Sequence, residues 1–417
     1  MFHLGGKGSK KNKIKFIPIE EVNSKDPESK SNYATIDDIR PLEWYVHPDS
    51  LQHLDNSTHS SIIGAIKPNM QSRVETQTLY FTDLKSGRSG FVQLVYSSVI
   101  NGLYKGFQLN FKIFGSEKKS SKDIWETYKL DNLMSFRPLR VEFDDVLFEF
   151  VRSDKKNESG GDVIAQLNIK VDIRPKPSEN QGRLKIDLKA DLYQGYMINP
   201  NGCSYYLDKA VSSVSQVEKG GDQDISSKML RHLFIPRGRC SGTISYTDSK
   251  GENDIKLTLS DVPISYIDAV QGLLPNKAAK SWNFLCYQSE NYSILCMEYT
   301  TTEEYGNDTV TIYSITNKEK ITKLISCVNK CKVVYDKTIE DKDNGWSYPT
   351  SIAFPMDFSE PELNLVNRYD IMEELPLIVK KIAQNIANVK PYIYQYCQKS
   401  SFENEEGISI IESTFIS

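Results

Sequence analysis

The feature that most constrains the fold is an alternation of apolar and polar side chains in residues 163–173, interrupted only at Ile164, and in residues 184–192. In the first stretch the odd positions are apolar, and in the second the even positions are. Because successive side chains of a strand point to opposite faces, this pattern is typical of strands with one buried face. The linker 174–182, RPKPSENQG, contains the Pro and Gly residues of a turn. Together these features predict a pair of antiparallel strands.

Further strand candidates precede and follow this pair. In the first half of the chain they are residues 74–82, 91–100, 107–113 and 141–151. After the loop-like stretch 199–224, a second series comprises residues 229–240, 243–247, 255–259, 281–288, 292–300, 309–316 and 352–358. Apolar residues occupy both faces of 292–300, as in the wall of a β-barrel. The two series predict two related antiparallel barrels, in domains 33–228 and 229–397.

One stretch has helical periodicity, and the two ends of the chain have none. Apolar residues recur at helical spacing in 369–389 and Pro391 follows, which predicts a helix near the C-terminus. The polar residues 1–32 and 398–417 predict disordered tails. Five lysines within the first fifteen residues leave two other interpretations open, a nuclear-import signal or a weak membrane-surface contact.

Composition restricts the functional classes. The chain has 417 residues and a net charge of -4, so no global basic field attracts nucleic acid. A signal-peptide core and a bilayer-spanning apolar run are both missing from the sequence, which predicts a soluble cytoplasmic protein. The 7 Cys form an odd and sparse set, which favours reduced thiols.

Three stretches carry a resemblance to a known family. They are NKAAKSWNFLCYQSENYSILCMEYTTTEEYG (276–306), VETQTLYFTDLKSGRSGFVQLVYSSVING (74–102) and KPYIYQYC (390–397). Across residues 73–397 the chain resembles the fungal survival factor family. The resemblance implies tandem lipocalin-like barrels that bind ceramide or a related sphingolipid. It also implies carriage between endoplasmic reticulum and Golgi, and a link to survival of oxidative stress.

The chain departs from the family pattern at several positions. Gly5, Gly6 and Gly8 interrupt the N-terminal segment, where the family's transfer-active members carry an amphipathic helix. Ile235 replaces a Trp, and Glu303-Glu304 replaces a Pro pair. These differences indicate a diverged member, whose contact with membranes is expected to be weak and transient.

A cationic cluster is the first candidate ligand site. Arg231, His232 and Arg237, with Arg239 beside them, lie within a few residues. One interpretation is a polar anchor at a barrel mouth or at the interdomain seam, donating hydrogen bonds to a lipid head group. The other interpretation is a set of interdomain salt bridges.

Three tryptophans are the second candidate site. Trp125, Trp282 and Trp346 could line an apolar cavity, or could fill the interior of a small barrel as a structural plug. The sequence leaves both interpretations open.

The sequence offers no catalytic, metal or cofactor motif. Cys327 and Cys331 have C-x₃-C spacing without a second pair, so two free thiols are expected and no zinc site. A phosphate loop, a dinucleotide fingerprint and a Ser/His/Asp arrangement are all missing. The expected function is lipid binding without catalysis. The rivals are a lipocalin-like isomerase or hydratase acting on a hydrophobic substrate, and a filled barrel that serves as a stress-response scaffold.

Overall fold

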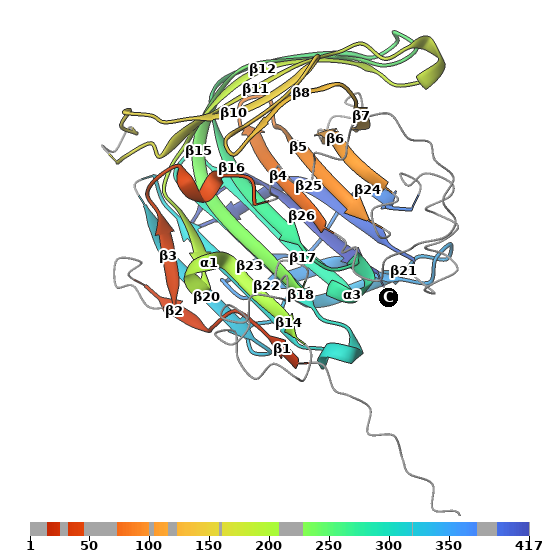
Figure 1. Cartoon of the computed structure of the whole chain (residues 1–417). Helices are drawn as coiled ribbons and strands as arrows, with labels where there is room; N and C mark the ends of the chain where they lie inside the picture. The colour runs from red at the N-terminus through yellow and green to blue at the C-terminus, as the bar shows by residue number, and fades with distance from the viewer. Residues whose placement is uncertain are drawn as a thin grey trace, which may run out of the picture.

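The computed structural model describes residues 15–25, 32–45, 73–99, 104–115, 123–157, 161–207, 228–318, 320–372 and 390–416, and this part of the chain is almost entirely β (Figure 1). The helical elements are short: α1 (Asn199–Gly202), α3 (Pro275–Ala278), η1 (Arg40–Leu42), η3 (Pro177–Glu179) and η5 (Glu303–Tyr305). No helix among the described residues is long and apolar enough to cross a bilayer. The predicted all-β class is confirmed.

The first sheet contains fifteen strands. They are β1 (Lys15–Ile17), β3 (Tyr33–Ile36), β4 (Arg73–Asp83), β5 (Arg88–Val99), β6 (Tyr104–Ile113), β7 (Ile124–Leu130), β8 (Leu133–Arg137), β9 (Arg140–Phe143), β10 (Val146–Val151), β11 (Ala165–Ile173), β12 (Arg183–Leu192), β13 (Gly195–Ile198), β14 (Cys203–Leu207), β15 (Met229–Thr247) and β16 (Asp254–Gln271). The main path is β7-β6-β5-β4-β16-β15-β12-β11-β10-β9-β8, with antiparallel neighbours throughout.

The alternating stretches 163–173 and 184–192 form β11 and β12, which pair antiparallel as expected. Their register places Leu167 opposite Ala190 and Ile169 opposite Leu188, and all four side chains are buried. The polar positions between them keep exposed surface. Local alternation therefore sets both the register and the inner face of this pair.

The first sheet curls so that side chains from its two halves meet in one apolar interior (Figure 1). Phe107 of β6 lies 5.4 Å from Phe143 of β9, and Phe150 of β10 lies 5.6 Å from Tyr266 of β16, measured between ring centroids. Strands distant along the sheet thus share one apolar core inside the curl. The predicted first barrel is present, and large side chains occupy much of its interior.

The second sheet has eight strands and carries a smaller sheet on its inner face. Its order is β2-β20-β19-β18-β17-β26-β25-β24, and Ile352, Phe354 and Phe358 of the three-stranded sheet β21-β22-β23 share its core. The strands are β2 (Val22–Ser24), β17 (Ser281–Ser289), β18 (Ser293–Thr300), β19 (Thr309–Thr316), β20 (Ile321–Val328), β21 (Val334–Glu340), β22 (Ser347–Phe354), β23 (Phe358–Glu360), β24 (Leu365–Asp370), β25 (Tyr392–Phe402) and β26 (Glu405–Phe415).

The sheets divide later in the chain than the predicted boundary at 228/229. β15 pairs with β12 and β16 pairs with β4, so both belong to the first sheet. β15 bends at two irregularities, Ile235/Gly238 and Cys240/Gly242, yet remains one strand. At Gly242, with φ near +142°, a Cβ would lie 2.0 Å from the Asp187 carbonyl oxygen. These interruptions of the alternation obscured the continuity of the strand in the sequence.

The terminal predictions need correction. The described part of the predicted tail 398–417, residues 398–416, is not a tail, because β26 lies between β17 and β25 in the second sheet. In the N-terminal 1–32, β1 pairs with β14 and β2 with β20, whereas 1–14 and 26–31 lie outside the described residues. Of the predicted helix 369–389, Tyr369 and Asp370 belong to β24, and 373–389 also lie outside the described residues.

The expectation of free thiols is wrong for one pair. Cys327 and Cys331 form a disulfide, with Cα atoms 5.7 Å apart at the end of β20. The other five cysteines are free, and Cys286 and Cys296 are small core residues on opposite faces of the second sheet. The C-x₃-C spacing therefore closes a short loop.

We expect Ile411→Ala to lower the free energy of unfolding by about 2–5 kcal/mol, because the Ile411 side chain is fully buried in the core of the second sheet. Urea denaturation monitored by circular dichroism would measure the change. The control is Glu406→Ala in the same strand, where the side chain is exposed and the loss should stay within about 0.5–1 kcal/mol. Equal small effects at both positions would mean that the C-terminal residues are not part of the folded sheet.

Candidate functional site

The two sheets pack against each other through their outer faces, and this contact, here called the seam, is the candidate site. Tyr80 of β4 lies 5.1 Å from Phe284 of β17, and Phe91 of β5 belongs to the same buried cluster. Figure 1 shows β4 and β5 crossing the direction of β25 and β26. The seam therefore covers a face that alternation alone would assign to solvent.

Polar side chains form a hydrogen-bonded ladder on the seam face of the first sheet. Gln93 Nε2 donates to Thr78 Oγ1 at 2.8 Å, and Asn110 Nδ2 donates to Gln93 Oε1 at 2.8 Å. Gln108 Nε2 donates to Asn110 Oδ1 at 3.1 Å. We call Thr78, Gln93, Asn110 and Gln108 the amide ladder. Its members come from β4, β5 and β6 and carry no net charge.

A group of charges lies beside the amide ladder. The Lys112 side chain has no exposed surface and forms an ion pair with Asp123. Burial lowers the pKa of Lys112 and raises the pKa of Asp123, while each partner opposes the shift of the other. Across the seam, Gln395 Nε2 donates to Glu412 Oε1 at 2.7 Å, and burial raises the pKa of Glu412. The first sheet thus supplies an amine and a carboxyl group beside the ladder, and β26 of the second sheet supplies another carboxyl group.

Trp125 stands at the edge of this polar region. Its ring lies 5.6 Å from Phe91 and 4.2 Å from Tyr369, and the Lys112 Nζ lies 5.6 Å from the ring. A cavity of about 350 Å³ opens here, lined by Arg88, Asp123, Ile124, Trp125, Tyr246, Asp248, Glu252, Asn253, Asp254 and Ile255. Trp125 is therefore a cavity residue that also joins the two sheets.

His232 and Trp282 meet at another part of the seam. Their rings lie 6.0 Å apart, and Tyr299 lies 5.0 Å from Trp282 and 6.1 Å from His232. Burial, and secondarily the charge of Arg231, lowers the pKa of His232 to about 4, so the ring is neutral at pH 7. Trp282 keeps some exposed surface, whereas His232 is buried. This pair brings together a member of each predicted set.

The arginines divide between two roles. Arg237 crosses the seam and donates to Ser293 Oγ at 2.9 Å and to the carbonyl oxygens of Ser289 and Glu290. Arg239 forms an interdomain salt bridge of 2.7 Å with Glu290. Both contacts favour the structural interpretation of the cluster. Arg231 instead faces the interior of the first barrel, where it pairs with Asp268 at 3.3 Å.

Trp346 lies apart from the seam. Its Nε1 donates to the Lys390 carbonyl oxygen at 2.8 Å, and its ring stacks on Phe415 at 5.4 Å. It packs against the core of the second sheet. The structure thus joins His232 with Trp282, places Trp125 and Arg237 elsewhere along the same seam, and separates Arg231 and Trp346 from it.

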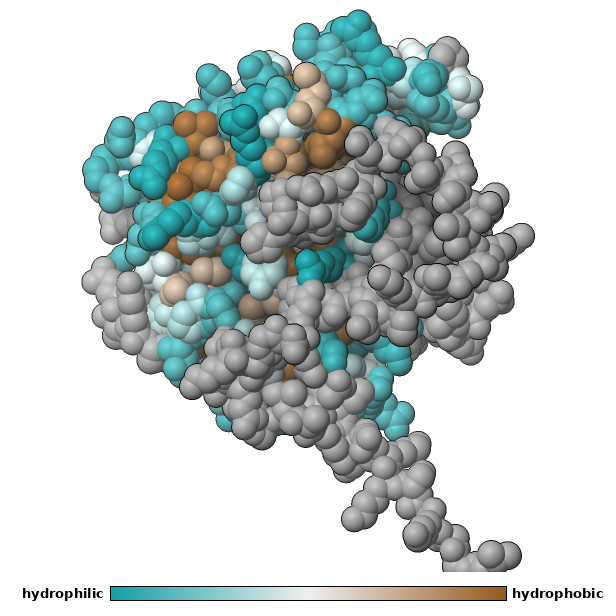
Figure 2. Space-filling view, in the orientation of Figure 1, coloured by the Kyte–Doolittle hydropathy of each residue, from teal (hydrophilic) through white to brown (hydrophobic). Residues whose placement is uncertain are grey.

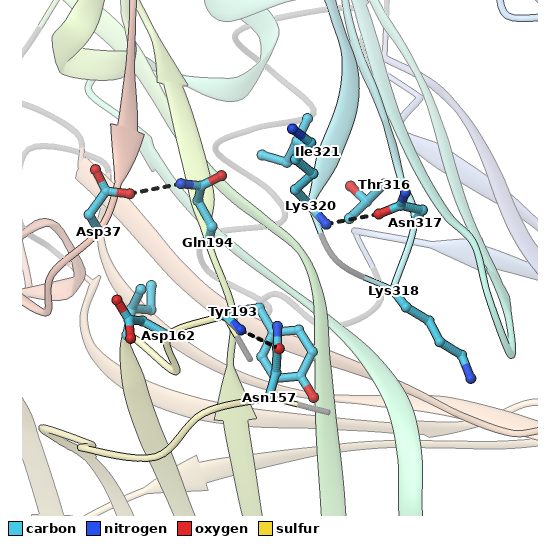
Figure 3. Close-up of a pocket in the computed structure, with 12 residues that line it drawn as sticks. Asp37, Asn157, Asp162, Tyr193, Gln194, Thr316, Asn317, Lys318, Lys320 and Ile321 are labelled. Atoms are coloured by element: carbon cyan, nitrogen blue, oxygen red, sulfur yellow. Dashed lines mark hydrogen bonds between the residues drawn. The ribbon is translucent and has the colours of Figure 1, made fainter. Parts of the chain in front are cut away.

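A second cavity, of about 260 Å³, lies between the barrels (Figure 3). Gln194 donates to Asp37 at 2.9 Å on the side of the first sheet. On the opposite side, the Lys320 backbone N–H donates to Asn317 Oδ1 at 2.8 Å. Polar and apolar groups contribute about equally to the lining, and several of its polar groups are already hydrogen-bonded to each other.

The described residues contain no group of three metal-ligating side chains. The carboxylate of Glu298, inside the second barrel, accepts hydrogen bonds from Asn283 at 3.0 Å, Thr311 at 3.1 Å and the Val333 backbone at 2.7 Å. Burial raises its pKa, and the three donors oppose that shift. This saturated carboxylate is suited to holding strands together.

A family model described as the Svf1 family matches residues 6–417. The chain belongs to the Svf1 family. The SVF1-like protein YDR222W of Saccharomyces cerevisiae is 52% identical, over 98% of this chain and 99% of its own length. The ceramide-binding protein SVF1 of Debaryomyces hansenii is 31% identical, over 84% of this chain and 87% of its own length. The solved structure of CghA with Sch210972 is 8% identical with a TM-score of 0.48, over 83% of this chain and 89% of that chain.

In this Svf1-family chain, sequence reasoning missed the amide ladder. Residues 107–113 predict a half-buried strand whose Gln, Asn and Lys positions face water. In the structure Asn110 is only 8% exposed, on the same face as Tyr80 and Phe91, which pack against the second sheet. The residue types were visible in the sequence, but the covering sheet comes from residues more than 170 positions later.

We expect acid to destabilise the protein through His232. With a pKa of about 4 in the folded state and 6.5 in the unfolded state, only the unfolded chain binds this proton between those values. The sign is a loss of stability as the pH falls from about 6.5 to about 4, reaching about 2 kcal/mol at pH 5. Urea denaturation at pH 7 and pH 5 should show that His232→Phe lacks this part of the loss. An identical pH response in wild type and variant would contradict the buried neutral ring.

Proposed function

We propose that this protein binds a lipid of the ceramide class at the seam, with the polar end of the lipid at the amide ladder and Trp125. The single observation that carries the proposal is an uncharged ladder of donors and acceptors on the same face as the apolar seam cluster. Relatives named as ceramide-binding proteins support the choice of ligand.

The chemistry of the ladder fits a ceramide head. Such a head carries an amide and hydroxyl groups, which donate and accept hydrogen bonds and have no charge. Asn110 and Gln93 present the same kinds of groups, and a buried carboxamide exchanges partners at little electrostatic cost. A charged head group would instead have to compete with the Lys112–Asp123 pair.

The apolar chains of a lipid have a wall to follow. Trp125, Trp282, Met297, Val366 and Cys397 pack against the buried seam cluster but are only partly buried themselves. Each methylene removed from water contributes about 0.8 kcal/mol, so contact along this wall stabilises a long chain. Hydrophobic residues also gather among hydrophilic ones over the upper part of the molecule, where the first sheet lies (Figure 2).

The cavity at Trp125 is small for a whole lipid. Its volume of about 350 Å³ is at the low end of the roughly 300–1,000 Å³ of small-molecule sites. We infer that it receives the polar end, and that the two acyl chains enter when the sheets separate along the seam. The apolar contacts between sheets would then be exchanged for contacts with the chains.

The cellular role follows from this binding. We propose cytoplasmic carriage of the lipid between endoplasmic reticulum and Golgi, with transient membrane contact, in support of survival under oxidative stress. This part rests on the family resemblance, and on the need of an enclosed lipid to exchange with a membrane.

We expect Asn110→Leu and Trp282→Ala to weaken ceramide binding about 3–10-fold and at least 10-fold, respectively. The first loses one or two hydrogen bonds of about 0.5–1.5 kcal/mol each, and the second loses part of the apolar wall. Fluorescent ceramide titrated into delipidated protein would measure both, with melting temperatures run in parallel. Gln166→Leu is the control, because that amide bonds Asp191 on the outside of the first barrel. If the wild type carries no lipid after gentle isolation and takes up no ceramide, the proposal is wrong and the filled-barrel scaffold is favoured.

We expect a covalent bond across the seam to slow ceramide loading. Cys286 Sγ of β17 lies 3.6 Å from Ser265 Oγ of β16, so Ser265→Cys places two thiols face to face between the sheets. The oxidised variant should load ceramide several-fold more slowly than the reduced variant. Wild type under the same redox treatments controls for the Cys327–Cys331 disulfide. Equal loading rates would show that the chains enter without separation of the sheets.

A further inference from the structure

The cavity of about 350 Å³ at Trp125 contains an arginine to which the proposed function assigns no role. Arg88 is the first residue of β5, is half-buried, and shares the lining with residues around the start of β7. No hydrogen bond, ion pair or ring contact joins its guanidinium to another residue in the described part of the chain. Unpaired N–H donors away from bulk water cost free energy, and an acceptor in the cavity would remove that cost.

The acid opposite Arg88 in the β4–β5 hairpin has other partners. Asp83 lies directly opposite Arg88 in the register of the two strands. Its carboxylate instead accepts hydrogen bonds from the Lys85 backbone N–H at 3.1 Å and from the Ser86 hydroxyl at 2.5 Å. The hairpin that carries Arg88 therefore supplies no counter-charge for it.

The rest of the lining comes from the hairpin of β15 and β16. Its residues are Tyr246, Asp248, Glu252, Asn253, Asp254 and Ile255. The Tyr246 hydroxyl donates to Glu126 Oε1 at 2.6 Å, which fastens this hairpin to β7. The lining is more polar than apolar, so the cavity suits the head of a lipid better than its chains.

The carboxyl groups of the lining that could pair with Arg88 have partners of their own. Asp123 forms an ion pair with Lys112, and Asp254 pairs with Lys256 at 3.0 Å. Asp248 accepts hydrogen bonds from a backbone N–H and an amide group of its own turn. These partners leave the guanidinium at the start of β5 without a counter-ion among the described residues.

The charges of the lining define the class of head group. Arg88 is the one basic residue among the described lining residues, whereas the acidic ones are Asp123, Asp248, Glu252 and Asp254. An anionic head would therefore meet repulsion from the β15–β16 turn. A cationic head would place a second positive charge beside the guanidinium and offer it no acceptor. A neutral carbonyl oxygen avoids both costs, because it accepts hydrogen bonds without a net charge.

We propose that Arg88 selects lipids of the ceramide class by donating hydrogen bonds to the amide carbonyl oxygen of the head. This role rests on the proposed function, because it takes the cavity at Trp125 as the place of the polar end. A hydrogen bond from a charged donor is about twice as strong as a neutral one, so this contact exceeds each neutral contact of the head. Lipids with the same chains but no carbonyl lose it and bind more weakly.

The hydroxyl groups of the head have an acceptor in the same cavity. Glu252 lies in the turn between β15 and β16, and its carboxylate has no hydrogen bond to another described residue. A hydroxyl next to the amide can donate to it while the carbonyl accepts from Arg88. The donor of β5 and the acceptor of the turn thus orient the head in one direction.

The test uses ceramide that is isotope-labelled at its amide carbonyl and bound to the delipidated full chain, measured by infrared difference spectroscopy. Hydrogen bonds from a guanidinium lower the stretching frequency of a carbonyl group. We expect the labelled band at a lower frequency in wild type than in Arg88→Met, and ceramide affinity about 10-fold weaker in the variant, because hydrogen bonds from a charged donor are lost. The same band position in both proteins, at protein concentrations that bind all of the lipid, would overturn the role of Arg88.

Two further variants and a second lipid complete the test. Arg88→Lys keeps a charged donor and should restore part of the band shift and of the affinity. The control is Arg40→Met, because Arg40 is exposed and pairs with Asp38 away from the cavity. Tighter binding of a ceramide phosphorylated on its terminal hydroxyl would contradict the neutral acceptor and make the cavity an anion site. If wild type binds no ceramide, the proposed function fails as well. If wild type binds ceramide and Arg88→Met binds it equally tightly, only the role of Arg88 fails.

Discussion

The structure depends on the packing of two curled sheets through their outer faces. A curled sheet buries its inner face by closing on itself, and its outer face would normally meet water. Here the second sheet packs on the outer face of β4 and β5 at Tyr80 and Phe91, so this part of the first sheet is buried on both sides. The first twelve residues of β15, from Met229 to Cys240, are buried without interruption for the same reason. Because both faces of these strands are covered, polar residues on the outer face become buried, and such buried polar residues are candidates for a ligand site.

Double burial also explains why polar residues gather where they do. A Gln or Asn on a solvent face needs no partner, but the same side chain under a second sheet must form hydrogen bonds or lose free energy. At the seam the amide ladder meets this need by pairing its members with each other. Inside the first barrel, Gln77 and Asp268 do not complete theirs. The two regions therefore differ. The amides of the ladder form hydrogen bonds with one another and can exchange them for bonds to a ligand, whereas Gln77 and Asp268 keep polar atoms without a hydrogen bond.

Sequence reasoning succeeded where the determining contacts are local. The alternation in 163–173 and 184–192 gave the strands, their turn and their inner face, because a strand's own period decides which side chains share a face. It failed at β15, where Pro236 and two bulges break the alternation within one strand, and the boundary was placed at its start. It failed again at β26, whose charged turn resembles a tail although Ile408, Ile410 and Ile411 are buried. Among the six predicted site residues, His232 and Trp282 are the pair that the fold brings together from distant parts of the chain, because packing across the seam joins positions 50 residues apart.

The contacts of Arg237 show how the two sheets can be held in a specific arrangement and still separate. Its guanidinium is buried, and burial lowers its pKa to about 10, with the neighbouring Arg239 charge adding to the shift. Its guanidinium donates hydrogen bonds to the Ser293 hydroxyl and to two backbone carbonyl oxygens, so these contacts across the seam involve no carboxylate. A buried ion pair at this point would cost far more to break, because separation would expose two unpaired charges to a poorly solvated gap. Neutral acceptors leave a contact that is specific in geometry and moderate in strength. Burial of the apolar area around Tyr80 and Phe284 then supplies most of the free energy that holds the two sheets together. An acyl chain between the sheets can replace these apolar contacts with its own.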